Sequence, residues 1–173
     1  GVGYLRSVLN TAGIESRMVD LRYDNEEILA CIKRHDPVAV GFSVIFEVYI
    51  EEFAQLARYL RKGGINCHFT AGGYYASLHP DELFRLIPEL DSIVRFEGEY
   101  TLPELVKCLI TNTDWKRVRS IAFREDGLIV RTPPGKLEED LDRFPFPVRR
   151  APGEYAPGRK FTTIISGRGC IYD

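Results

Sequence analysis

The chain has 173 residues, of which 45% are hydrophobic and 28% charged, and its 23 basic and 25 acidic side chains leave a formal net charge of −2. This composition excludes disordered, collagen-like and coiled-coil proteins, and the balanced charge argues against a nucleic-acid partner. No apolar run approaches the roughly 20 residues that a membrane-spanning helix requires, and no signal peptide opens the chain. We therefore expect a cytoplasmic protein without a membrane partner.

The first two thirds of the chain alternate helix-favouring and strand-favouring segments. The run from Val38 to Ser43 is almost continuously apolar, which is typical of a parallel strand covered by helices on both faces. Helices are expected over 2–12, after a cap at Asp24, over 48–61, after Pro80 and over 101–110, and strands over 15–21, 38–43, 65–71 and 91–96. This alternation predicts an α/β fold with a doubly wound parallel sheet of the Rossmann or flavodoxin-like type.

From Arg117 the pattern changes. Two strand-like segments flank Asp126-Gly127, a sequence that favours a β-hairpin, and we expect this antiparallel ribbon to extend the edge of the sheet. Six of the ten prolines lie between Pro133 and Pro157, which indicates an extended connector. The predicted divisions are an α/β domain over 1–116, a hairpin over 117–135, a connector over 136–160 and the first strand of a further domain over 161–173.

The beginning of the chain also suggests a longer protein. A doubly wound domain normally opens with a strand, whereas Gly1 already lies at the start of the first expected helix. We expect that first strand to precede Gly1.

Candidate binding residues follow the expected strands, because ligands of such sheets bind beyond the carboxyl ends of the strands. The hydroxyl of Ser43 can donate and accept a hydrogen bond, and Gly72-Gly73 lets backbone approach a bulky ligand. Glu97 and Glu99 alternate along the chain and so point to opposite faces. We expect them to cap a helix and fix a loop rather than to form an acid–base pair.

These motifs resemble those of the cobalamin-binding domain family. Ser43 to Ile45 and Gly72-Gly73 match its SxL and GG motifs in type and in separation, with 26 residues between Ile45 and Gly72. Gly1 matches the closing glycine of an upstream DxHxxG motif, whose aspartate and histidine, and with them any lower axial ligand, would precede the chain. The resemblance implies cobalamin as cofactor and the following cofactor-binding residues: Gly1, Ser43, Val44, Ile45, Gly72, Gly73, Glu97 and Gly98.

The chain is similar, more narrowly, to the cobalamin-dependent radical SAM enzymes. The similarity lies in the segments 1–5, 40–43, 72–73, 96–105 and 140–147. Two departures are Phe96, where a GEGE stretch is usual, and Tyr74-Tyr75, where a histidine is often found. Cys170 follows a strand-like segment and resembles the first cysteine of the CxxxCxxC cluster motif. The resemblance therefore implies a metal ligand at Cys170, with a [4Fe–4S] cluster and S-adenosylmethionine as cofactors of the full-length protein.

The function implied by the resemblance is the N-terminal cobalamin-binding part of a B12-dependent radical SAM enzyme. Such an enzyme would be a methyltransferase acting on an unactivated carbon, or a cyclase, and this part alone would hold no catalytic residue and show no activity. The expected partners are a small-molecule or peptide substrate, held by another domain, and a reductant for the cluster. The alternative is a flavodoxin-like binding or regulatory module that has lost cobalamin. The three histidines share no metal-ligand spacing, and Cys31, Cys67 and Cys108 are expected to be reduced thiols.

Overall fold

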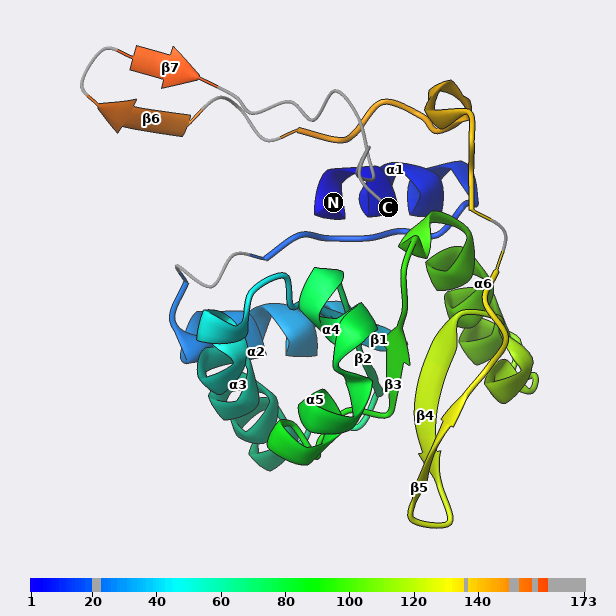
Figure 1. The fold of residues 1–173 in the computed structure, drawn as a ribbon. Helices are drawn as coiled ribbons and strands as arrows, with labels where there is room; N and C mark the ends of the chain where they lie inside the picture. The colour runs from blue at the N-terminus through cyan, green and yellow to red at the C-terminus, as the bar shows by residue number, and fades with distance from the viewer. Residues whose placement is uncertain (20–22, 136, 150–152, 157–158, 162–173) are drawn as a thin grey trace.

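The computed structural model describes residues 1–19, 23–135, 137–149, 153–156 and 159–161. Five strands form one mixed sheet in the order β1-β2-β3-β4-β5 (Figure 1). Strands β1 to β3 are parallel, and β4 and β5 continue the sheet in antiparallel fashion. Their bounds are β1 (Ala39–Ser43), β2 (His68–Gly72), β3 (Ser92–Val94), β4 (Ile121–Glu125) and β5 (Leu128–Arg131). The predicted α/β fold with its appended hairpin is confirmed.

Six α-helices accompany these strands in the described part of the chain. They are α1 (Val2–Thr11), α2 (Asn25–His35), α3 (Ile50–Lys62), α4 (Tyr74–Leu78), α5 (Pro80–Leu86) and α6 (Gly98–Ile110). The predicted cap of α2 is present as a full capping box, in which Asp24 accepts from the Glu27 N–H at 2.8 Å. Helix α4 was not predicted, because its five residues are too few to show helical periodicity. None of the described helices is long and apolar enough to cross a membrane.

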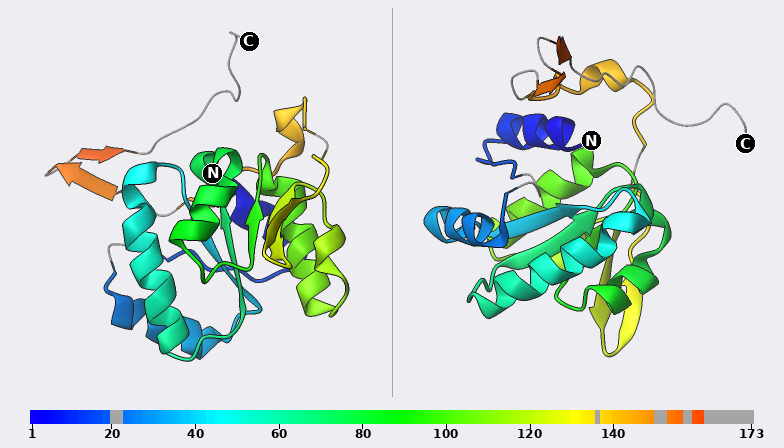
Figure 2. Two further views of the ribbon diagram at one scale, coloured as in Figure 1. Left: turned by 60° about the horizontal axis from the view of Figure 1, so that its bottom comes forward. Right: turned by 90° about the vertical axis from the view of Figure 1, so that its left-hand side faces the viewer.

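The two faces of the sheet carry different side chains. On one face Phe42, Phe69 and Ile93 are buried in an apolar core that α2, α3 and α5 complete. The left view of Figure 2 shows α3 and α5 in front of the sheet and α1 behind it. On that rear face β1 and β2 present small or polar residues, while α6 packs over β3 and along α1. The rear face of β1 and β2 therefore lacks the bulky apolar residues of an ordinary helix-covered sheet.

The expected strand over 15–21 is wrong for the residues that the structure describes. Residues 15–19 belong to no ladder, although their exposure alternates as in a strand, and residues 20–21 lie outside the described part. In the described sheet β1 pairs only with β2, and residues 15–19 do not lie in register with its free edge. An alternating sequence predicts which side chains turn inward, but it forms a strand only where a partner lies beside it.

The loop from Val94 to helix α6 is also shorter than expected. α6 begins at Gly98 rather than at Thr101, so Pro103 lies in its second turn. At the hairpin, Asp126 and Gly127 have φ angles of 49° and 78°, as a two-residue turn between twisted strands requires. The sequence predicted this turn correctly.

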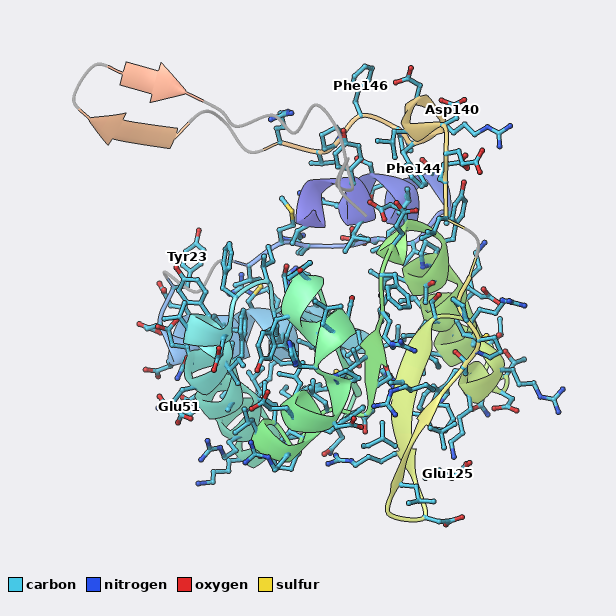
Figure 3. The ribbon with its side chains drawn as sticks, viewed as in Figure 1. Tyr23, Glu51, Glu125, Asp140, Phe144 and Phe146 are labelled. Atoms are coloured by element: carbon cyan, nitrogen blue, oxygen red, sulfur yellow. The ribbon has the colours of Figure 1, made fainter. Side chains whose placement is uncertain are left out.

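The connector is not simply extended. Residues 137–149 fold back across α1 and contain a short 3-10 helix, η3 (Leu141–Arg143). In Figure 3 Phe144 points toward the body of the protein and Phe146 points away from it, in agreement with exposures of 8% and 95%. A second hairpin follows, made of β6 (Gly153–Ala156) and β7 (Arg159–Phe161). Phe161 thus ends a hairpin strand, and the rest of the segment 161–173, expected to hold the first strand of a further domain, lies outside the described residues. The four predicted divisions stay a prediction.

Candidate functional site

The loops after β1 and β2 meet at the carboxyl end of the sheet. Ser43 and Gly72 are partners in the parallel register, and the Val44 N–H donates to the Gly72 carbonyl at 2.7 Å. Of the predicted triplet, Ser43 is half-buried, Val44 is buried and Ile45 is 43% exposed. The predicted Ser43 and Gly72 positions are therefore adjacent on the rear face of the sheet.

Gly73 is required by the fold of the chain itself. Its φ is +112°, and a Cβ built on it would lie 2.7 Å from the Val44 carbonyl oxygen. The two loops can approach this closely only because position 73 has no side chain. Gly72 differs, since a Cβ there would lie 3.4 Å from the nearest atom, the Val94 carbonyl oxygen. We expected the glycine pair to let a bulky ligand approach the backbone. Gly72 is the residue that offers such a surface without a side chain, and Gly73 makes the turn.

Gly41, in the middle of β1, is a candidate residue that the sequence reasoning missed. It lies on the same face as Ser43, beside Thr70 of β2, and it is exposed. A Cβ on Gly41 would meet only the Thr70 methyl carbon, at 3.9 Å, so neither backbone strain nor crowding requires glycine here. A glycine inside a strand often marks the close approach of a ligand. The break in the apolar run before Phe42 could have revealed it.

The loop after β3 joins the site through Ser77 of α4. The Ser77 hydroxyl donates to the Gly73 carbonyl at 2.8 Å and accepts from the Phe96 N–H at 2.7 Å. Further along, a Cβ on Gly98 would lie 3.0 Å from a methyl carbon of Leu5 in α1. Gly1 lies at the start of the same helix, where its carbonyl accepts from the Tyr4 N–H at 2.9 Å. The structure thus links Phe96 with the Gly73 turn, and places Gly98 beside Leu5, one helical turn after Gly1.

Glu97 fixes a loop, but its side chain does not cap a helix. It occupies the N-cap position of α6 without a capping hydrogen bond from its side chain. Its carboxylate instead accepts from the Glu138 N–H at 3.0 Å, which anchors the connector. Glu99 is buried in the first turn of α6, with 6% exposure. Of the two roles expected for Glu97, loop fixation is confirmed and side-chain capping is wrong.

Large apolar side chains remain exposed directly after each of the three parallel strands. Phe46 and Val48 follow β1, Tyr74 follows β2 and Phe96 follows β3, and all four are at least 45% exposed. They follow the carboxyl ends of the same strands that carry Gly41, Ser43 and Gly72, or of the next strand in the sheet. A hydroxyl, a strip without side chains and an apolar rim suit a large, flat ligand with polar edges, and a corrinoid with its nucleotide tail has this character.

The described part of the chain holds no group of three histidine, cysteine or acidic residues that could bind a metal ion. Cys31, Cys67 and Cys108 are half-buried free thiols. Cys67 and Cys108 pack against apolar clusters, whereas the Cys31 sulfur lies 3.8 Å from Nδ1 of His35. His68 lies in β2 and is hydrogen-bonded to the Ser92 hydroxyl at 2.7 Å. Burial lowers the pKa of His68 below its ordinary value, and Arg61 nearby acts in the same direction while Asp91 opposes it. Cys170 lies outside the described residues, so its metal-binding role stays a prediction.

Comparison with protein families and curated sequences gives the relatives of this chain. The family model described as B12 binding domain matches residues 1–106. An uncharacterized methyltransferase, PH0819 of Pyrococcus horikoshii, is 26% identical over 100% of this chain and 39% of its own length. The anaerobic magnesium-protoporphyrin IX monomethyl ester cyclase of a Synechocystis strain is 32% identical over 67% of this chain and 24% of its own. The chain therefore spans only about a quarter to two fifths of the length of these relatives.

Two solved structures share the fold. The radical S-adenosylmethionine methyltransferase TsrM from Kitasatospora setae, solved with cobalamin and a [4Fe–4S] cluster, superposes with a TM-score of 0.66 at 21% identity, over 85% of this chain and 28% of TsrM. The cobalamin-dependent S-adenosylmethionine radical enzyme OxsB, with aqua-cobalamin and S-adenosylmethionine bound, gives a TM-score of 0.66 at 24% identity, over 79% of this chain and 20% of OxsB. At these identities the likeness shows a common fold.

Proposed function

Because the chain belongs to the B12-binding domain family, we propose that it binds cobalamin at the carboxyl ends of β1, β2 and β3. The observation that carries this proposal is the side-chain-free strip of Gly41 and Gly72 beside the Ser43 hydroxyl. A nucleotide tail is long, flat and polar at its edges. It would lie along such a strip without meeting a Cβ.

Each candidate residue then has a part in holding the cofactor. The Ser43 hydroxyl would hydrogen-bond the tail, and Gly41 and Gly72 would form the wall against which it lies. Val44 and Ile45 continue from Ser43 toward the apolar rim, and the backbone of Gly73 fixes the turn between the two loops. Gly1, Glu97 and Gly98 would close the site from α1 and from the start of α6. When bound, cobalamin would supply a cobalt centre that can carry a methyl group or an electron.

We also propose that this cobalamin domain serves a B12-dependent radical SAM enzyme, in which Cys170 is the first ligand of a [4Fe–4S] cluster that binds S-adenosylmethionine. The relatives support this proposal, since they include proteins named as a methyltransferase and a cyclase and the two radical S-adenosylmethionine enzymes. The reaction would be methylation of an unactivated carbon, or a cyclisation. The substrate, a small molecule or a peptide, would be held by another part of the protein, and a separate reductant would reduce the cluster.

The cobalamin site can be tested by filling the strip. The intact protein is equilibrated with hydroxocobalamin and desalted, and the retained corrinoid is measured from its visible absorption. We expect the wild type to retain corrinoid, Gly41→Ala to retain less and Gly41→Val to lose most of it. The melting temperature should stay the same or rise, because valine favours a strand more than glycine does.

Ala39→Val is the matched control, because it adds bulk to the same face of β1 at the end remote from Ser43. It should leave corrinoid retention unchanged. A wild type that retains no corrinoid would overturn the proposed function and favour a regulatory module. Full retention by a folded Gly41→Val variant would show that the strip is not the site.

The enzyme assignment has a separate test in Cys170→Ala. In the intact protein, reconstituted with iron and sulfide, this variant should lose the visible absorption of a thiolate-ligated cluster and the reductive cleavage of S-adenosylmethionine. It should still retain cobalamin, because the cluster ligand lies in another part of the chain. If Cys170→Ala keeps both the cluster and the cleavage activity, the radical SAM assignment is wrong.

A further inference from the structure

Phe96 has a backbone conformation that bulky residues rarely adopt. Its φ is +62°, in the left-handed region where a Cβ crowds the following carbonyl. The other described non-glycine residues with positive φ are aspartate, asparagine or serine: Asp36, Asn112, Ser120 and Asp126. Their short polar side chains tolerate this region, whereas a phenylalanine is strained in it. Such strain persists only where the surroundings enforce it, and it is concentrated at functional sites.

Hydrogen bonds on both sides of the peptide enforce this conformation. The Arg95 N–H donates to the Ser120 carbonyl at 2.7 Å, and the Phe96 N–H donates to the Ser77 hydroxyl at the same distance. Ser77 is itself buried, with 7% exposure, and its hydroxyl also donates to the Gly73 carbonyl. One hydroxyl therefore holds both the left-handed residue and the turn of the cofactor site.

The strain does not serve to bury the ring within the described structure. Phe96 is 45% exposed, although the Arg95 guanidinium carbon lies 4.7 Å from the ring centroid and steadies it by a cation–π contact. Because the ring stays half exposed, its burial within the described structure offsets little of the free-energy cost of the left-handed conformation. The gain must come from whatever covers the ring beyond the carboxyl end of β3.

We propose that Phe96 is a specificity-determining contact of the cofactor site, and that its ring packs against the apolar edge of the corrin. Ser77 is then a positioning residue, which acts by holding the Phe96 backbone. This inference rests on the proposed cobalamin binding. It adds an aromatic contact to the strip formed by Gly41, Ser43 and Gly72.

The test separates the ring from the backbone strain by comparing Phe96→Ala with Phe96→Gly. Both variants lack the ring, so both should bind hydroxocobalamin about tenfold more weakly than the wild type, as removal of roughly 50 Å² of apolar contact implies. Only glycine relieves the strain, so Phe96→Gly should melt about 2 to 6 °C above Phe96→Ala. Phe96→Tyr, which keeps the ring, should bind as the wild type does.

Asn112 offers a matched control, because it has a φ of +51° at the far end of α6. Asn112→Gly should melt above Asn112→Ala by a similar margin, and neither variant should change corrinoid affinity. A double-mutant cycle tests Ser77. Ser77→Ala should weaken binding more in the wild type than in Phe96→Ala, where only its bond to the Gly73 carbonyl still matters. Fully additive effects would contradict its positioning role.

The outcomes distinguish this inference from the proposed function. A wild type without corrinoid affinity overturns both. If the wild type binds corrinoid and the folded Phe96→Ala and Phe96→Gly variants bind it equally well, the cobalamin site stands and the role of Phe96 is wrong. The ring would then be covered by another part of the protein.

Discussion

The carboxylate of Glu97 accepts a hydrogen bond from the backbone N–H of Glu138 at 3.0 Å, across 41 residues of sequence. The Glu138 side chain is itself only 3% exposed, and it accepts from the Tyr100 hydroxyl and from the Asp140 N–H. Phe144 packs on Tyr100 with the ring centroids 5.3 Å apart. The connector that we expected to be extended is therefore tied to a residue of the candidate site.

Removing the Glu97 carboxylate should loosen the connector. In Glu97→Ala we expect faster amide hydrogen exchange over residues 137–149 and earlier cleavage there by trypsin, because the Glu138 N–H loses its acceptor. Glu97→Gln keeps an acceptor oxygen and should behave nearly as the wild type. Glu104→Ala, at an exposed acidic residue of α6, should leave the exchange unchanged. Equal protection in Glu97→Ala and the wild type would contradict the proposed anchor.

A second anchor of the connector is Ser7 of α1. Its hydroxyl donates to the Phe146 carbonyl at 2.6 Å and accepts from the Val148 N–H at 2.9 Å. Ser7→Ala should lower the free energy of unfolding by about 1 to 3 kcal/mol, because the Phe146 carbonyl loses this donor and the Val148 N–H keeps only its bond to the Gly3 carbonyl, at 3.1 Å. The measurement is urea unfolding of the intact protein. Thr11→Ala, whose hydroxyl bonds only within α1, is the control and should cost less. An equal effect of the two substitutions would show that the Ser7 bridge contributes nothing.

Gly73 and Gly64 together separate backbone strain from crowding. Both have positive φ angles, +112° and +89°, but a Cβ on Gly64 meets nothing within 4 Å, whereas one on Gly73 meets the Val44 carbonyl oxygen at 2.7 Å. We expect Gly64→Ala to destabilise the protein by about 1 kcal/mol. Gly73→Ala should cost about 1 to 3 kcal/mol more, because the two loops must move apart. Urea unfolding measures both, and similar values would rule out the close approach.

The half-buried ring of His68 should make stability depend on pH. Because burial lowers its pKa in the folded state, the unfolded chain takes up a proton first when the pH falls below about 6.5. The free energy of unfolding should therefore fall between pH 7.5 and the lowered pKa, and change no further through His68 below it. His68→Gln should flatten this part of the pH profile, measured by urea unfolding at several pH values. If His68→Gln and the wild type show the same slope, the pH dependence of the free energy of unfolding arises from other groups.

Local sequence determined most of the elements of this protein. The cap at Asp24, the turn at Asp126-Gly127 and the apolar periodicity of α3 each act within a few residues, so the pattern and the structure agree. The same holds for the serine and glycine motifs, because a strand end and a tight turn depend on neighbouring residues. The family could be identified from these local motifs.

Tertiary structure decided what depends on residues distant in sequence. Residues 15–19 have the alternating exposure of a strand, but they would form one only with a partner strand beside them. The significance of Gly41 appears once β1 and β2 are paired and its open face is visible. The left-handed Phe96 and the contact of Glu97 with Glu138 arise from hydrogen bonds across 19 and 41 residues. Local propensity describes the conformations a segment favours, whereas these features depend on which segments the folded chain brings together.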